Sequence, residues 1–336
     1  MLNSGALRLR WISAVALAGV LAWPDSSQAV LFADYGDAAH NTSAPTGLWE
    51  DSGWQYLGYY GGFLGTAISA NHFITAAHIG VQGSTFSSDS VFSGGPTINY
   101  TVDQTVNGGI GYWDIPGSDL RVYQITGTFS QWAELYTGTA TGSEVVMTGR
   151  GGVRGDAVFV NSTLKGYKHT GGDGVARWGT NTINGLSGSG AGTVLVASFD
   201  NSPGTTEEAG MSAGDSGGGL FALEGGVWKL AGVNYGVDGL FDTNDTENDG
   251  SEFMASLFDR GGLYEGMDSS GWTLVSDSSK DKPSNLYFSS IAANADAIKA
   301  ITALPVPEPG GAVLVAIGGL AWGLRRRRGS CQERLS

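Results

Sequence analysis

Residues 72–80 have the sequence HFITAAHIG, and this stretch decides what fold to expect around it. Phe73, Ile74 and Thr75 are typical of the end of a buried strand, and the two alanines that follow are small enough to pack tightly under a barrel. His78 then emerges where the strand ends. The pattern therefore predicts a strand that delivers an imidazole at its end.

A second stretch, MSAGDSGGGLF at residues 211–221, places an acid and a hydroxyl among glycines. Gly-Asp-Ser-Gly is ordinary turn chemistry in a chain with 55 glycines. The alternative is that Ser216 is a nucleophile on a tight turn, where backbone N–H groups stabilise an oxyanion. All histidines precede Ser216, which excludes the Ser-acid-His order of α/β-hydrolases and leaves His-Asp-Ser open. They are His40, His72, His78 and His169.

The rest of the chain has the texture of an all-β protein. Charged residues make up only 15%, and short runs rich in Val, Thr, Tyr and Phe recur between Gly/Asn/Asp clusters, as in INYTVDQTV and LRVYQITGTF. Such runs predict a barrel or a sandwich. Near the C-terminus the period changes, because Ile291, Ala295, Ile298 and Ile301 recur at helical spacing.

Two segments now carry a specific resemblance. GTAISANHFITAAHIG (residues 65–80) resembles the catalytic-histidine segment of trypsin-like serine proteases, and MSAGDSGGGLF resembles their serine segment. SEVVMTGRG, KLAGVNYGV and NLYFSSIAANADAIKAI are similar to three further elements of the second barrel and its closing helix. The resemblance covers residues 50–302 and implies a chymotrypsin-like double β-barrel. Its protease domain would span residues 30–303, with barrels over 50–140 and 141–290 and a helix over 291–302.

The resemblance implies that His78, Asp119 and Ser216 form a catalytic triad, with the N–H groups of Gly214 and Ser216 as oxyanion hole. Asp119 leads the apolar alternation of LRVYQI and follows His78 by 41 residues, which suits one barrel. Asp114, in YWDIPG, is the alternative acid, although we expect it to cap the Pro-Gly turn.

The family's pocket base falls six residues before the serine, at Gly210, and Asn234, Tyr235 and Gly236 stand where the family has Ser-Trp-Gly. Glycines at 210 and 236 suggest an open apolar pocket that lacks the carboxylate needed to prefer Arg or Lys. Glu207 and Glu208 are close in sequence, but we expect them in a solvated loop.

Asp215 raises the question of activation. In the family this acid pairs with an N-terminal ammonium group released before an Ile/Val-Val-Gly-Gly run, and no such run occurs here. Removal of an N-terminal leader would expose Val30, within VLFADYGD. Either another cation meets Asp215 or activation works differently.

The segment DGLFDTNDTENDGSEF (residues 238–253) is rich in oxygen ligands, which calcium prefers. Its spacing does not match an EF-hand, so a solvated acidic loop is the competing interpretation. No other cofactor is expected, and a zinc site is disfavoured because the only cysteine is Cys331, in the tail. The calcium candidates are Asp242, Asn244, Asp245, Glu247 and Asp249, with Glu252 in the same loop.

Both ends of the chain are typical of targeting segments. Residues 1–29 carry two arginines, an apolar run and SSQA, which predicts a signal peptide cut by signal peptidase. Residues 304–336 contain Pro307-Glu308-Pro309, an apolar run and four arginines, and they resemble the PEP-CTERM sorting signal. That resemblance implies an exosortase-type partner and a transient inner-membrane anchor on a protein of the bacterial cell envelope or exterior. A plain tail anchor is the alternative.

These observations predict an exported, monomeric serine endopeptidase that acts on polypeptides. Without its targeting segments the body (residues 30–309) has a net charge of −19, which disfavours nucleic acid. Two alternatives stay open: a non-catalytic surface or matrix binding protein on the same fold, and an esterase that uses the same triad.

Overall fold

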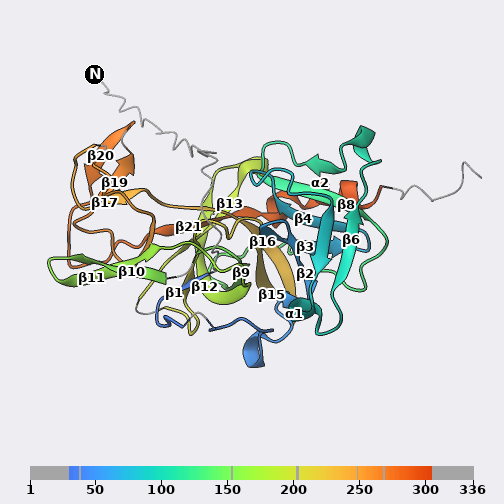
Figure 1. Ribbon diagram of the computed structural model, residues 1–336, viewed down its shortest axis with the longest axis horizontal. Coiled ribbons are helices and arrows are strands. Elements are labelled where there is room, and N and C mark those ends of the chain that lie inside the picture. Colours follow the sequence, from blue (N-terminus) through green and yellow to red (C-terminus); the bar gives the residue numbers. More distant parts are fainter. Residues whose placement is uncertain are drawn as a thin grey trace, which may run out of the picture. The chain divides into compact units, whose positions relative to one another are not determined.

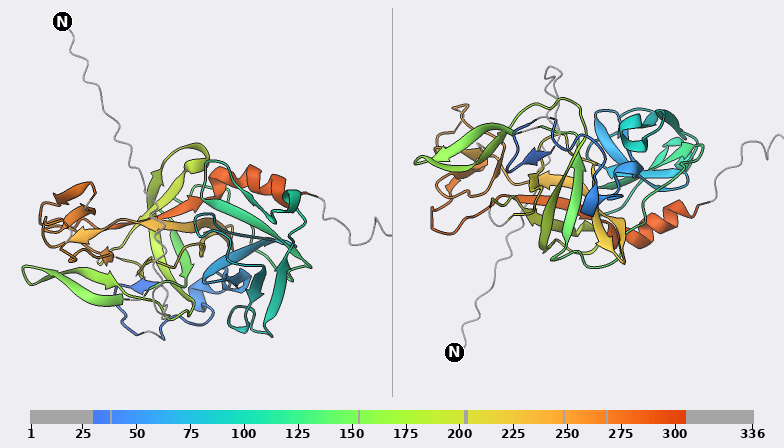
Figure 2. Two further views of the ribbon diagram at one scale, coloured as in Figure 1. Left: turned by 45° about the horizontal axis from the view of Figure 1, so that its top comes forward. Right: turned by 90° about the horizontal axis from the view of Figure 1, so that it is seen from below.

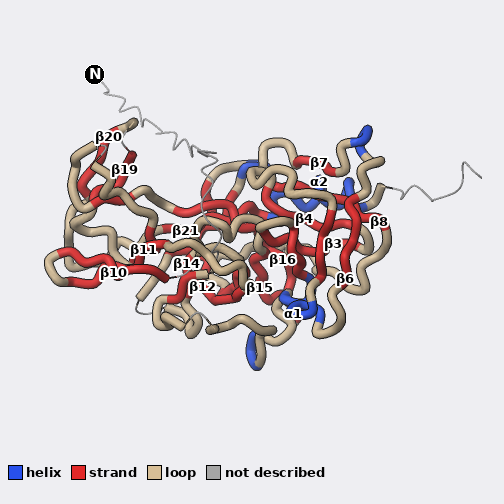
Figure 3. The backbone as a smooth tube through the Cα atoms, in the orientation of Figure 1, coloured by secondary structure: helices blue, strands red, loops and turns tan. Residues whose placement is uncertain are grey.

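Strands make up most of the regular structure, and helices are short (Figure 3). The computed structural model describes residues 30–304, apart from 38, 153, 202, 203, 248 and 268. The chain divides after Thr302 into two units, and the first contains every element described below. The helices are α1 (Ser90–Ser93) and α2 (Ile291–Thr302), with the 3₁₀ helices η1 (Gly47–Trp49), η2 (Trp54–Tyr56), η3 (Asn107–Gly109) and η4 (Gly190–Gly192).

Six antiparallel strands close the first barrel, because β4 pairs with β8 as well as with β3. Phe73 and Tyr123 lie opposite each other in the β4–β8 pair, and their rings stack 4.9 Å apart in the core. The strands are β2 (Leu57–Tyr60), β3 (Phe63–Ser69), β4 (His72–Ala76), β5 (Thr85–Ser88), β6 (Ile98–Val102) and β8 (Leu120–Thr126), with β7 (Tyr112–Asp114) added beside β8.

The second barrel is also a closed ring of six antiparallel strands. Along each strand every second side chain faces the interior of the barrel, and these side chains form its core. Met147, Leu220 and Phe288 are among them. Figure 2 follows the chain from the last strand of this barrel directly into α2. The strands are β9 (Glu144–Gly149), β12 (Arg177–Ser187), β13 (Val194–Ser198), β15 (Gly219–Glu224), β16 (Val227–Val237) and β21 (Asn285–Ser290).

Three small sheets are added to the second barrel. Figure 1 shows the larger two gathered beside it, on the side away from the first barrel. They are β10 (Arg154–Val160) with β11 (Thr163–His169) and β18 (Ala255–Leu257), then β17 (Phe241–Asp242) with β19 (Tyr264–Met267) and β20 (Gly271–Leu274), and finally β1 (Leu31–Phe32) with β14 (Ala209–Gly210).

Two tandem six-stranded barrels followed by a short helix form a chymotrypsin-like double β-barrel, so the predicted fold class is confirmed. Among the described residues, no helix has the length and apolar character that crossing a membrane requires. The predicted leader (residues 1–29) and the tail from residue 305 on lie outside the described residues.

Candidate active site

The register of two strands in the first barrel brings His78 and Asp119 together. β4 and β8 are antiparallel with Ala76 opposite Leu120, so the chain leaving β4 passes the chain entering β8. The Ala77 N–H donates to the Asp119 carbonyl at 3.0 Å and extends the pairing by one step. His78 therefore lies beside Asp119 although the two are 41 positions apart.

The Asp119 carboxylate holds His78 at two points. Its Oδ2 lies 2.6 Å from His78 Nδ1, and its Oδ1 accepts the His78 backbone N–H at 2.8 Å. A carboxylate at Nδ1 fixes the tautomer with the proton on that nitrogen, which leaves Nε2 free to accept one. His78 Nε2 lies 2.7 Å from Ser216 Oγ.

Ser216 sits on a turn that packs directly against the first barrel. The next residue, Gly217, has a φ of 82°, and a Cβ there would lie 2.2 Å from Thr75 Oγ1 and 2.6 Å from the Leu64 carbonyl oxygen. Only glycine combines this conformation with this close approach. The glycines of the AGDSGGG stretch therefore bring the hydroxyl of one barrel to the imidazole of the other.

Two backbone N–H groups on this turn are available to a ligand. Asp215, Gly217 and Gly218 donate their N–H groups to carbonyls within the protein. The N–H groups of Gly214 and Ser216 donate to no other group of the described chain. These are the two donors that the sequence analysis assigned to the oxyanion hole.

Asp215 is buried beneath the turn. Its carboxylate accepts hydrogen bonds from the N–H groups of Gly151 (2.6 Å) and Ser212 (2.8 Å), and Oδ1 also accepts from Val30 N at 3.3 Å. Burial raises the pKa of this carboxyl to about 6, although the hydrogen bonds oppose the rise. Asn234 Nδ2 donates to the Asp215 carbonyl at 2.8 Å and so braces the same turn.

A cavity of about 100 Å³ opens beside Ser216. Asn234, Tyr235 and Gly236 line it, as the sequence predicts, and the Tyr235 ring lies 6.1 Å from the His78 ring. Gly210 does not line it, because it pairs with Leu31 in the β1–β14 sheet. The apolar side chains on its wall, which the sequence analysis did not find, are Met211, Ala213, Val237 and Met254.

Glu207 and Glu208 do not line this cavity either, and neither has the fully solvated position expected from the sequence. Glu207 Oε2 lies 2.6 Å from His40 Nε2. Glu208 is buried and accepts hydrogen bonds from Asn181 and Thr205. Burial raises the pKa of Glu208 to about 7.

Asp114 is held away from His78 by an ion pair. Its two oxygens lie 2.6 Å from Arg121 Nε and 3.1 Å from Arg121 Nη2, and the two residues are opposite each other in the β7–β8 pair. This cross-strand pair replaces the turn cap expected from the sequence.

The remaining histidines, His72 on β4 and His169 on β11, each contact a serine hydroxyl within a sheet. His72 Nδ1 lies 2.8 Å from Ser69 Oγ, and burial lowers the His72 pKa to about 4. His169 Nε2 lies 3.1 Å from Ser256 Oγ, and burial likewise lowers its pKa to about 4. Both are therefore neutral near pH 7. In the described part of the chain, the one group that could hold a metal is the carboxylate cluster of Asp242, Asp249 and Glu252.

Comparison with known proteins gives no family assignment. No family model matches the chain, and no curated protein does. Among similar solved structures is neuropsin, a serine protease expressed in the limbic system of mouse brain, at 14% identity and a TM-score of 0.41 over 75% of this chain and 96% of that one. Another is the atomic-resolution structure of HBP, at 15% identity and a TM-score of 0.43 over 78% of this chain and 97% of that one. The fold assignment rests on the strand pairing described above.

Proposed function

We propose that the protein is a serine endopeptidase in which His78, Asp119 and Ser216 act as a catalytic triad. One observation carries the proposal: the His78 ring lies 2.6 Å from Asp119 Oδ2 through one nitrogen and 2.7 Å from Ser216 Oγ through the other. A serine hydroxyl is a poor nucleophile until an adjacent base takes its proton. This arrangement supplies the base and the group that orients it.

In the proposed reaction, Ser216 Oγ attacks the scissile carbonyl while its proton passes to His78 Nε2. The N–H groups of Gly214 and Ser216 would stabilise the oxyanion, and Asp119 would stabilise the imidazolium. His78 then gives the proton to the leaving amine, and an acyl-enzyme forms. Water, deprotonated by His78, attacks this ester and releases Ser216.

We further propose that Val30 supplies the activating charge. The supporting observation is the position of Val30 N, 3.3 Å from Asp215 Oδ1 in a buried site. Ala29-Val30 is also the predicted cleavage point of the leader. Cleavage there would convert the peptide N–H into an ammonium group next to a buried carboxylate that has no ion-pair partner in the described chain.

The preferred substrate side chain would be apolar. Two methionines and a valine contribute to the pocket wall, and the only carboxyl among the lining residues is that of Asp215, which is occupied by backbone donors. Burying an arginine or lysine without a partner costs several kcal/mol. Basic residues should therefore be poor substrates.

Export and sorting belong to the proposal as well. The signal peptide over residues 1–29 and the PEP-CTERM-like tail over 304–336 rest on sequence pattern alone. They support a protease that leaves the cytoplasm and is held by its tail until an exosortase-type enzyme processes it.

Labelling with a fluorophosphonate probe tests the nucleophile. The protein that begins at Val30 should be labelled, and Ser216→Ala in the same protein should abolish labelling while circular dichroism stays unchanged. Absence of labelling in the folded protein that begins at Val30 would favour the non-catalytic binding protein. Hydrolysis of short acyl esters without hydrolysis of casein would favour the esterase.

A further inference from the structure

A cluster of carboxylates lies at the end of β17 and in the segment that connects β17 to β18. One carboxylate oxygen from each of Asp242, Asp249 and Glu252 lies within 4.8 Å of the other two. No lysine, arginine or histidine of the described chain forms an ion pair with any of them. Three negative charges at this separation repel one another unless a cation lies among them.

Asp242 adds a second, independent observation. Its side chain is fully buried, and its Oδ1 accepts hydrogen bonds from Ser251 Oγ (2.6 Å) and Asn244 N (3.3 Å). Its Oδ2 is buried without any hydrogen-bond partner among the described residues. Burying a carboxylate oxygen with neither a donor nor a cation is strongly unfavourable. This oxygen is therefore in the condition expected of a metal ligand.

The chemistry of the cluster favours calcium. All three ligands are carboxylates, which are hard oxygen donors, and calcium accepts six to eight oxygens in a flexible geometry. Zinc prefers the nitrogen and sulfur ligands that this cluster lacks. Asn244 organises the loop instead of binding the ion, because its Nδ2 donates to Asp249 (3.0 Å) and its Oδ1 accepts from Thr246 N (2.7 Å). Asp245 and Glu247 are exposed and lie outside the cluster.

The cluster sits at the closing point of the loop. Phe241 and Phe253 exchange two backbone hydrogen bonds, of 2.9 and 2.8 Å, and Asp242 and Glu252 are their immediate neighbours on the loop side. An ion that binds both carboxylates would clamp the two chain segments at this bridge. Met254, the residue after Phe253, lines the cavity beside Ser216.

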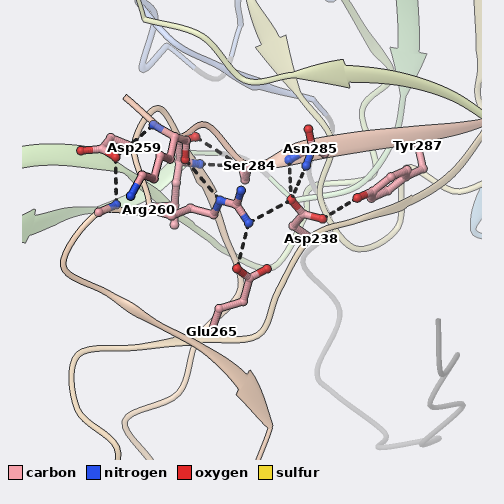
Figure 4. Close-up of polar contacts among 10 residues, drawn as sticks. Asp238, Asp259, Arg260, Glu265, Ser284, Asn285 and Tyr287 are labelled. Atoms are coloured by element: carbon pink, nitrogen blue, oxygen red, sulfur yellow. Dashed lines mark hydrogen bonds and ion pairs between the residues drawn. The ribbon is translucent and has the colours of Figure 1, made fainter. Parts of the chain in front are cut away.

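The segment that leads from β16 to β17 is already fixed without a metal. Figure 4 shows Asp238, which follows β16, accepting hydrogen bonds from Asn285 and Tyr287 on β21 and facing Arg260. The Asp238 oxygens lie 2.8 Å from Asn285 Nδ2 and 2.7 Å from Tyr287 Oη. Met254 is held from both sides: its carbonyl accepts a hydrogen bond from His169 N at 2.9 Å next to β18, and the Phe241–Phe253 bridge with the carboxylates beside it lies on the other side.

We propose that Asp242, Asp249 and Glu252 bind one Ca²⁺ ion, which holds the loop closed and keeps Met254 in the wall of the pocket. The binding site stands on the cluster alone. Its effect on the pocket rests on the proposed protease function.

Isothermal titration with CaCl₂ tests the site in the full chain carrying Ser216→Ala, which cannot digest itself. We expect one site with a Kd of about 0.1–1 mM, the range of extracellular calcium modules. Asp249→Asn and Glu252→Gln should each weaken binding about tenfold or more, and both avoid altering the buried Asp242. Asp245→Asn is the matched control, with the same charge change in the same loop, and should leave Kd within about twofold.

No saturable binding up to about 10 mM Ca²⁺ would overturn the site. Equal weakening by Asp245→Asn and Asp249→Asn would also overturn it, because only the net charge of the loop would then matter. The pocket effect is measured on the wild-type protein that begins at Val30, where Ca²⁺ should lower KM for a peptide with an apolar P1 residue and leave kcat nearly unchanged. Binding without a change in KM would overturn the link to the pocket. Absence of any peptide hydrolysis would refute the proposed function and leave the titration result standing.

Discussion

The backbone nitrogen of Val30 allows a direct test of what stabilises the turn that carries Ser216. In the uncleaved chain this nitrogen is a peptide N–H that donates to Asp215 Oδ1. In a chain that begins at Val30 it is an ammonium group. The perturbation is therefore one residue: a protein that begins at Val30 is compared with one that begins at Ala29, both ending at Ala303.

The size of the effect follows from the burial of Asp215. Burial raises its pKa from an ordinary value of 3.8 to about 6. Because the folded state then binds more protons than the unfolded state between these values, the free energy of unfolding falls as pH rises from about 4 to about 6. The loss is about 3 kcal/mol at neutral pH. An ammonium group at Val30 would lower this pKa and offset the loss, which corresponds to about a 100-fold difference in the equilibrium constant for ordering of the turn.

Two measurements check this. Urea unfolding at a series of pH values should show the loss of about 3 kcal/mol in the protein that begins at Ala29 and little loss in the one that begins at Val30. Fluorophosphonate labelling at neutral pH should be faster for the protein that begins at Val30, by a factor of up to about 100. Asp215→Asn is the control, since it should remove the difference between the two proteins. Equal labelling rates together with equal pH dependence would refute the assignment of Val30 as the partner of Asp215.

Three further predictions concern the acid, the pocket and the tail. Asp119→Asn should lower kcat by about 10⁴, because His78 would then hold the wrong tautomer. Asp114→Asn should change kcat little, since Asp114 contacts Arg121. Kinetics on one peptide substrate compare the two variants, and the reverse result would mean that the wrong carboxylate is assigned. A cleavage-site profile on a peptide library should show few Arg or Lys residues at P1, with weak inhibition by benzamidine, and a dominant basic P1 would contradict the pocket described here. A protein of residues 30–303 should be as active in peptide hydrolysis as one of residues 30–336. Mature protein from the native host should end near Pro307–Pro309 by mass spectrometry, and extracellular material that retains Arg325–Arg328 would rule out processing of the tail.

The sequence predicted the part of the site that is set by strand register and local turns. An apolar alternation after Asp119 and an apolar run before His78 place both residues at strand ends, and antiparallel pairing of those strands then brings them together. The glycines around Ser216 likewise predict a turn with unusual backbone angles. Both signals are local in the sequence, and the barrel contributes only the pairing of the strands.

The contacts that escaped prediction depend on chain segments that no local pattern links. Val30 N contacts the Asp215 carboxylate although the two residues are 185 positions apart. The two-residue strand β1, which follows Val30, pairs with Ala209–Gly210 and brings this part of the chain close to Asp215. Gly210, six residues before Ser216, takes part in that same pairing and is not among the residues that line the cavity. Met254 enters the pocket from the segment between β17 and β18, which contains none of the motifs that carry the resemblance.

The acidic loop shows why spacing alone could not choose among its carboxylates. Along the sequence, Asp245 and Glu247 are as plausible as calcium ligands as Asp242 and Asp249. The Phe241–Phe253 bridge decides between them, because it forces the next residues inward, Asp242 and Glu252, to lie side by side. Asp245 and Glu247 are left exposed within the loop. In a loop closed by a bridge, the residues next to the closing pair lie side by side, so a bridge moved one residue inward would place Thr243 opposite Ser251 and leave no pair of carboxylates beside it.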